Sequence, residues 1–148
     1  MTTASAPDTT GLGADLLSVV ARLNRFATQR TQLPLPWAQA RLLSTIEDRG
    51  EARISDLAEL DHCSQPTMTT QVRRLEDAGL VTRTPDPGDA RAVLIRITET
   101  GIEVLARARV DRAAVIDPLL EQLTDAERSA LSTAVDVMRQ MLRTAQNS

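Results

Sequence analysis

Residues 54–101 read ISDLAELDHCSQPTMTTQVRRLEDAGLVTRTPDPGDARAVLIRITETG, and this segment contains the clearest structural pattern of the chain. Ser55 can cap a short helix over residues 56–60, and Ser64 can cap a second helix that has Pro66 in its first turn and ends at Gly79. Residues 81–85 and 93–98 alternate polar and apolar side chains, and the Pro- and Gly-containing residues 86–91 between them favour a turn. The predicted order is therefore helix, turn, helix and hairpin.

The helix expected over residues 64–79 has two unlike faces. At about 100° per residue, Met68, Val72 and Leu75 fall on one side, where they can pack against the preceding helix and the hairpin. The opposite side, with one threonine at its edge, carries small polar and basic residues: Pro66, Thr67, Thr70, Arg73, Arg74 and Thr69. Threonine and arginine hydrogen bond to base edges and phosphates, so this face suits a DNA major groove. A solvated face whose arginines pair with Glu76 or Asp77 is the alternative.

The hairpin adds Arg83 on its first strand and Arg91 near its tip. Asp89 precedes Arg91 by two residues, close enough to hold the arginine side chain in one pose. An arginine on a hairpin tip fits the narrow, negative minor groove, and a routine turn salt bridge is the alternative. Two helices and a charged hairpin in this order predict a winged helix-turn-helix, in which the second helix enters a major groove.

The hairpin region also follows a family pattern, Asp-x-Arg, then alternating apolar residues, then Thr-x-x-Gly. The matching residues are Asp89, Arg91, Ile95, Ile97, Thr98 and Gly101. Upstream matches are Leu35, Gln39, Leu43, Leu57-Ala58, Ser64, Thr67, Thr69, Arg74-Leu75-Glu76, Gly79-Leu80-Val81 and Arg83. On these residues the chain resembles the MarR family (multiple-antibiotic-resistance regulators) of bacterial transcription factors. Ala90 and Thr70 stand where many members carry a basic residue, and both remove positive charge from the expected contact surface.

The resemblance implies a mainly α fold with a small β-hairpin wing and a helical dimerisation domain built from both chain ends. It implies a homodimer that binds a pseudo-palindromic operator in double-stranded DNA and represses a nearby promoter. Together with the helix and hairpin faces, it gives these expected DNA contacts: Ser64, Gln65, Pro66, Thr67, Thr69, Thr70, Arg73, Arg74, Arg83, Asp89 and Arg91.

The resemblance also implies a site for a small aromatic or phenolic effector, between the dimerisation helices and the winged module. The residues in that region of the sequence are Asn24, Arg25, Phe26, Gln29 and Trp37. Each of them has a plain structural alternative, with the two aromatic residues as core anchors and the polar residues solvated.

The chain ends predict dimerisation from their own residues. Residues 1–13 are expected to form a flexible tail, residues 14–33 and 99–146 a helical dimerisation region, and residues 34–98 the winged module. Thr124 and Glu127 form a capping box at the start of the last helix. The terminal helices carry many apolar residues: Leu16, Leu17, Val20, Leu23, Leu119, Leu120, Leu123, Leu131, Val135, Met138 and Leu142. A homodimer would bury them and place two recognition helices about one DNA turn apart, whereas a self-contained helical core is the alternative.

Composition agrees with one globular domain. The chain has 148 residues, of which 42% are hydrophobic and only 1% aromatic, so the core must be built from aliphatic side chains. All 17 basic residues are arginine, which binds phosphate as a planar fork, although codon bias from a GC-rich genome is the favoured explanation of this choice. The net charge of −3 counts against DNA binding, but only the charge at the contact surface matters for phosphate binding.

Other chemistries find little support in the sequence. Cys63 is the only cysteine, which fits a reducing cytoplasm, and a structural role is favoured over redox sensing. One cysteine beside the single His62 cannot supply a metal site. The absence of a nucleophile–base set, a phosphate loop, a signal peptide and a long apolar run argues against an enzyme, a cofactor or a membrane protein. The alternative function is a winged-helix protein-interaction module with weak or lost DNA binding.

Overall fold

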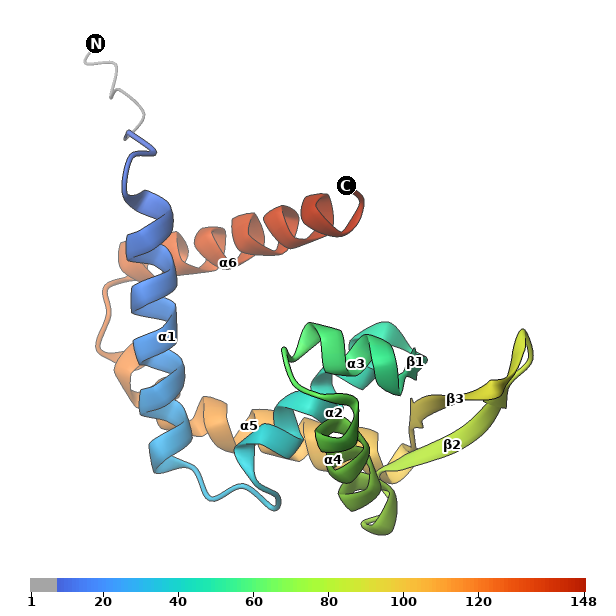
Figure 1. Cartoon of the computed structure of the whole chain (residues 1–148). Helices are drawn as coiled ribbons and strands as arrows, with labels where there is room; N and C mark the ends of the chain where they lie inside the picture. Colours follow the sequence, from blue (N-terminus) through green and yellow to red (C-terminus); the bar gives the residue numbers. More distant parts are fainter. Residues whose placement is uncertain (1–7) are drawn as a thin grey trace. The chain divides into compact units, whose positions relative to one another are not determined.

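The computed structural model describes residues 8–148, so residues 1–7 of the expected tail lie outside the described residues. The chain divides after Arg112 into two compact units, the second formed by Ala113–Ser148. In chain order the elements are α1 (Leu12–Arg30), α2 (Trp37–Arg49), β1 (Ala52–Arg53), α3 (Ile54–Leu60), α4 (Gln65–Asp77), β2 (Val81–Asp86), β3 (Asp89–Ile97), α5 (Glu99–Glu121) and α6 (Asp125–Gln146) (Figure 1). The mainly helical fold is as predicted, and so is the small β wing, which is the hairpin formed by β2 and β3.

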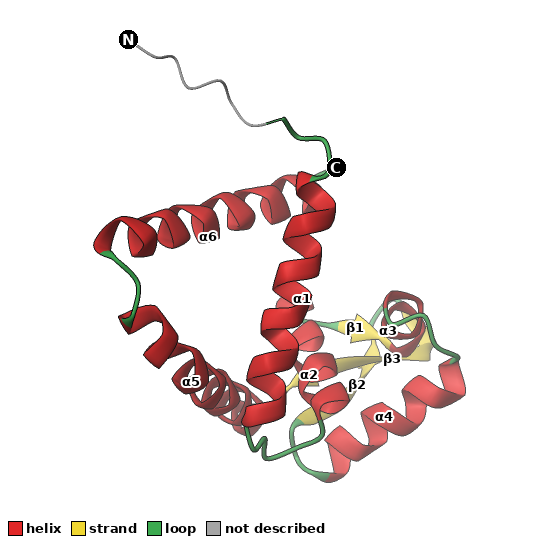
Figure 2. Cartoon of the chain, turned by 90° about the vertical axis from the view of Figure 1, so that its left-hand side faces the viewer, coloured by secondary structure: helices red, strands yellow, loops and turns green. Residues whose placement is uncertain are grey.

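The winged module has an aliphatic core. Met68, Val72 and Leu75 of α4 are fully buried, as the helical spacing predicts, and they join one cluster with Leu43 and Ile46 of α2. Figure 2 shows α2, α3 and α4 gathered around the three strands. Because its apolar face is committed to this cluster, α4 presents its threonine and arginine face outward.

The sheet is antiparallel, in the order β1-β3-β2. The turn is shorter than the expected loop over residues 86–91, because Asp86 already pairs with Asp89 across the hairpin. This leaves Pro87 and Gly88 as a two-residue connection, with an irregularity in the register between Pro85 and Asp86. The shorter turn lets the two strands continue almost to the tip of the wing.

Two helices begin earlier than the sequence predicts. α1 begins at Leu12 rather than at residue 14, after Gly11 at a left-handed φ of 78°. α3 begins at Ile54, so Ser55 lies inside the helix and the prediction that it caps this helix was wrong. Arg53 occupies the N-cap, because it is still paired with Leu94 of β3 and the chain passes directly from the strand into the helix.

The junction between the wing and α5 explains the Thr-x-x-Gly motif. The Thr98 hydroxyl donates a hydrogen bond to the Gly79 carbonyl oxygen at 2.7 Å and accepts one from the Gly101 N–H at 3.0 Å. A Cβ placed on Gly101 would lie 2.3 Å from the carbonyl oxygen of Leu80. Only glycine therefore lets the first turn of α5 approach the start of the hairpin this closely.

The last helix begins with the predicted capping box. The Thr124 hydroxyl accepts the Glu127 N–H at 3.2 Å, and the Glu127 carboxylate accepts the Thr124 N–H at 2.8 Å. α6 has no buried residue, although Leu131, Val135 and Leu142 lie along it. Within residues 8–148, no helix has the length and apolar character needed to cross a membrane.

Candidate nucleic-acid interface

The N-terminus of α4 is built as the sequence predicts. The Ser64 hydroxyl oxygen accepts the Thr67 N–H at 3.2 Å, and Pro66 occupies the first turn, where a missing N–H has no cost. The Ser64 hydroxyl also donates to Thr67 Oγ1 at 2.8 Å. Ser64, Gln65, Pro66 and Thr67 are all exposed. This end of the helix is therefore open to an approaching phosphate.

The outward face of α4 carries hydroxyls and guanidinium groups. The Thr69 hydroxyl donates to the Gln65 carbonyl oxygen at 2.8 Å, and the Thr70 hydroxyl donates to that of Pro66 at 3.1 Å. Their oxygens remain available as hydrogen-bond acceptors and their methyl groups as apolar contacts. Thr70 is exposed and Thr69 is half-buried, which agrees with its expected place at the edge of the face.

Arg73 and Arg74 are exposed, and neither forms an ion pair within the described part of the chain. The structure therefore does not contain the alternative arrangement, in which these arginines pair with Glu76 or Asp77. Glu76 instead accepts a hydrogen bond from Arg83 Nε at 2.8 Å, which links α4 to β2. Two guanidinium groups on α4 are therefore available to a ligand, whereas that of Arg83 is partly engaged.

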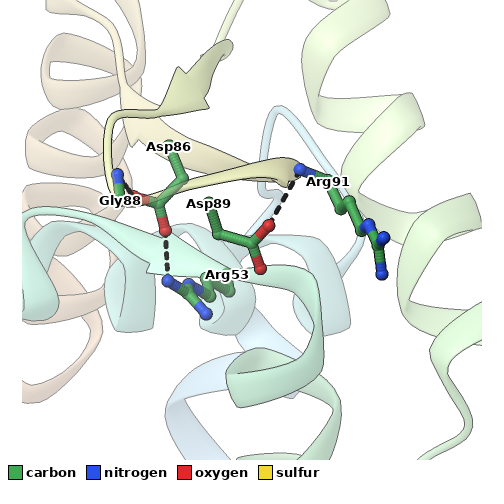
Figure 3. Close-up of polar contacts among 5 residues, drawn as sticks. All are labelled: Arg53, Asp86, Gly88, Asp89 and Arg91. Atoms are coloured by element: carbon green, nitrogen blue, oxygen red, sulfur yellow. Dashed lines mark hydrogen bonds and ion pairs between the residues drawn. The ribbon is translucent and has the colours of Figure 1, made fainter.

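Asp89 acts on the backbone of Arg91 and not on its side chain (Figure 3). Its Oδ1 accepts the Arg91 N–H at 2.9 Å, and within residues 8–148 no ion pair joins the Arg91 guanidinium to a carboxylate. The prediction that Asp89 holds the arginine side chain was therefore wrong in its detail, because the carboxylate closes a local Asx turn instead. Arg91 itself is exposed on the wing.

An ion pair that the sequence analysis missed holds the wing tip. Arg53 Nη2 contacts Asp86 Oδ2, while Asp86 Oδ1 accepts the Gly88 N–H at 2.9 Å (Figure 3). The hydrogen bond from Gly88 and the pairing with Arg53 hold the pKa of Asp86 below its ordinary value, although burial opposes this shift. The Asp-Pro-Gly sequence could have indicated the Gly88 contact, since aspartate often accepts the N–H two residues on. Nothing local could have indicated Arg53.

The expected effector residues separate into two groups. Asn24 and Trp37 meet at Arg112 of α5: its Nη2 donates to Asn24 Oδ1 at 3.0 Å, and its guanidinium carbon lies 4.3 Å from the centre of the Trp37 ring. Phe26 stacks instead under Arg30, at 4.0 Å. The remaining two residues, Arg25 and Gln29, are exposed. The structure therefore joins two of the five expected residues, through an arginine that the sequence analysis did not single out.

A small cavity of about 130 Å³ lies beside Arg112. Its lining residues come from α2, α5 and the segment before α2: Leu33, Trp37, Ala40, Arg41, Ser44, Leu105, Ala108, Arg109 and Arg112. Arg109 is engaged by two neighbours, since it contacts Glu47 at 3.2 Å and Ser44 at 3.3 Å. Arg112 is less fully engaged, because its Nε has no hydrogen-bond partner among the described residues. Its partial burial lowers its pKa.

An outward-facing second helix beside a hairpin with an exposed arginine is the arrangement of a winged helix-turn-helix, the class of fold in which the second helix enters a DNA major groove. The model of the MarR family matches residues 35–93. An uncharacterized HTH-type transcriptional regulator of Mycobacterium bovis is 34% identical over 128 residues, which are 86% of this chain and 90% of that protein. The HTH-type transcriptional repressor IacR of Pseudomonas putida is 29% identical over 104 residues, covering 70% of this chain and 62% of the repressor.

Solved structures show the same fold. A transcriptional regulator of Thermotoga maritima matches with a TM-score of 0.73 and 24% identity, over 95% of this chain and 99% of that one. A mutant of E. coli MarR in complex with operator DNA matches with a TM-score of 0.55 and 19% identity, over 89% of this chain and 99% of that one. The chain belongs to the MarR family of transcriptional regulators, a family of regulators and not of enzymes.

Proposed function

We propose that this regulator binds a pseudo-palindromic operator as a homodimer, with α4 in the major groove and the wing in the adjacent minor groove. The observation that carries the proposal is the presence of exposed, unpaired guanidinium groups on both elements, among the described residues: Arg73 and Arg74 on α4, and Arg91 on the wing. The open N-terminus of α4 adds amide groups for phosphate, with Gln65, Thr67 and the other exposed residues of its first turn beside them.

The homodimer is supported by apolar side chains that neither terminal helix buries. On α1, Leu17 is 71% exposed and Val19 is 62% exposed. On α6, Met141 is 55% exposed and Leu142 is 63% exposed. Because large apolar surfaces are usually covered by a partner, we take the exposed apolar residues of these two helices as candidates for the dimer contact. Pairing two chains through residues 14–33 and 99–146 would cover it and present two copies of the winged module of residues 34–98 to the two halves of an operator.

Repression is the expected outcome of binding, since a dimer seated over a promoter excludes the polymerase. IacR, a relative named as a repressor, supports the same direction. Because a transcriptional regulator must reach the chromosome, we place its action in the cytoplasm, and we propose no catalytic activity for it.

Selection of bound fragments from genomic DNA tests this proposal. The wild-type chain should enrich fragments that share a pseudo-palindromic site. Arg91→Ala should weaken binding to all of these sequences, and Arg73→Ala should also relax the base preference, at a cost of about 1–3 kcal/mol each. Arg107→Ala is the control, because Arg107 is also exposed but lies on α5, where it pairs with Asp111. If no fragment is enriched, the alternative of a protein-interaction module is favoured.

A small aromatic acid or phenol is the effector that the Arg112 cavity fits best. The partners of Arg112, namely Asn24 and the Trp37 ring, are neutral, so its charge can still attract an anion. An apolar cavity of about 150 Å³ is known to hold one benzene ring, so a cavity of about 130 Å³ admits a single ring at most.

Trp37 is the only tryptophan, so its fluorescence reports directly on this cavity. Titration with benzoate and with phenol should quench or shift the emission of the wild-type chain and should release bound DNA. Arg112→Gln should abolish the response to benzoate. A response that is unchanged in this variant would argue against the site.

A further inference from the structure

Two ion pairs hold the wing, one at its tip and one at its base. At the base, Arg83 of β2 is bound to Glu76 of α4. At the tip, Arg53 of β1 is bound to Asp86, whose side chain is only 10% exposed. Because the strand order is β1-β3-β2, β1 and β2 are not neighbours, and the Arg53 side chain must reach across β3 to make this contact. The ion pair therefore connects the two outer strands of the sheet.

The tip has little else to hold it. β1 pairs with β3 only at Ile95 and Leu94, so the part of the hairpin beyond Leu94 is a two-stranded ribbon. Such ribbons are marginally stable on their own, and here the register is also irregular next to Asp86. The Asp86 carboxylate shapes the turn through Gly88 and anchors it through Arg53. The Asp86 carboxylate therefore links the turn of the hairpin to strand β1 at the other edge of the sheet.

We propose that Arg53 is a positioning residue for operator binding, whose ion pair with Asp86 fixes the wing tip so that Arg91 meets the minor groove. The inference rests on the proposed function, since it requires Arg91 to contact DNA. Asp89 already fixes the backbone of Arg91 within the hairpin. The Arg53–Asp86 pair then fixes the hairpin relative to the module that carries α4. The distance between α4 and the wing tip, the two elements proposed to contact DNA, therefore stays constant.

Positioning and simple charge effects predict opposite results for Asp86→Asn. The asparagine keeps an oxygen for the Gly88 N–H but loses the negative charge that binds Arg53. If only charge matters, removing a carboxylate near the phosphates should strengthen DNA binding. If the pair positions the wing, binding should weaken although the protein has become less acidic. We expect a loss of about threefold to tenfold, no larger than the loss caused by Arg91→Ala.

The experiment uses the full chain and an operator duplex recovered by the genomic selection. Affinities are measured for the wild type, Arg53→Gln, Asp86→Asn and Arg91→Ala. They are also measured for Arg53→Gln and for Asp86→Asn, each combined with Arg91→Ala. The control is Glu51→Gln, which removes the partner of Arg96 on the same sheet without touching the tip. Melting temperatures check that each variant folds, and Arg53→Lys, which keeps the charge, should recover part of the lost affinity.

We expect Arg53→Gln and Asp86→Asn each to weaken binding, and neither to weaken it further once Arg91 is alanine. Hydroxyl-radical protection of the minor groove beside the wing should fade in both variants, while protection of guanine N7 in the major groove persists. The inference is overturned if Asp86→Asn binds as tightly as the wild type, or if its effect adds fully to that of Arg91→Ala. It is also overturned if only Arg53→Gln weakens binding, because Arg53 is then a direct phosphate contact. Failure of the proposed function looks different, since the wild type itself would then bind no duplex.

Discussion

Replacing Gly101 with alanine places a methyl group where the structure has no room for it. The added Cβ would lie 2.3 Å from the Leu80 carbonyl oxygen and 2.7 Å from Ile97 Cγ1, and real Cβ atoms essentially never approach closer than 3.0 Å. The carbonyl belongs to the backbone and accepts the Thr98 N–H at 2.9 Å, so it cannot rotate away like a side chain. Relief requires the first turn of α5 to move away from the start of the hairpin.

Three contributions set the size of the effect. Overpacking costs about 1–3 kcal/mol. Stretching the hydrogen bond from Thr98 to Leu80 costs about 1 kcal/mol more. Alanine offsets about 1 kcal/mol of this loss, because its helix propensity is better than that of glycine. We therefore expect a net loss of about 2 kcal/mol in the free energy of unfolding, which corresponds to a melting temperature roughly 4–8 °C lower for a chain of this size.

Thermal unfolding followed by circular dichroism at one fixed protomer concentration measures this loss. Gly13→Ala is the matched control, because Gly13 also lies in a helix but a Cβ added to it would have nothing within 4 Å. The control should be as stable as the wild type or slightly more stable. If Gly101→Ala melts with the control instead of below it, the close approach of α5 to the hairpin is not a feature of the protein in solution.

Three further predictions concern other parts of the chain. Val135→Asp on α6 should turn the dimer into a monomer in sedimentation and abolish operator binding, whereas Ser129→Asp, on the polar side of the same helix with Asp125 and Asp136, should do neither. Because the N–H of Gly88 and the neighbouring guanidinium lower the pKa of Asp86, its stabilising contribution should be complete above the ordinary value of 3.8 and be lost as the pH falls through the lowered pKa; acid titration of Asp86→Asn should lack this step. Thr98→Val leaves the Gly79 carbonyl and the Gly101 N–H without their hydroxyl partner, and should cost about 1–3 kcal/mol in thermal unfolding.

Features that depend on neighbours in the sequence could be predicted. The buried face of α4 follows from the spacing of Met68, Val72 and Leu75, and its start follows from the Ser64 cap. The capping box of α6 follows in the same way from Thr124. In each case the partners lie within one or two helical turns, so the local chain geometry alone brings them together.

Features that depend on distant pairs could not be predicted. Arg53 and Asp86 are 33 residues apart, and Asn24 and Arg112 are 88 apart, so only the folded chain brings each pair together. The prediction for Asp89 failed for a different reason. Its carboxylate could bind either the backbone N–H or the guanidinium of Arg91, and in the structure it binds the N–H.

The salt dependence of operator binding is the decisive measurement, because the proposed function requires two paired chains that each present an arginine-bearing wing to DNA. Each phosphate contact contributes about 0.9 to the slope of log affinity against log salt concentration. A dimer carries two copies of Arg91, so Arg91→Ala should reduce the steepness of that slope by about 1.8. A slope that is the same in the variant and the wild type would contradict the account, because the wing would then make no contact with the phosphate backbone.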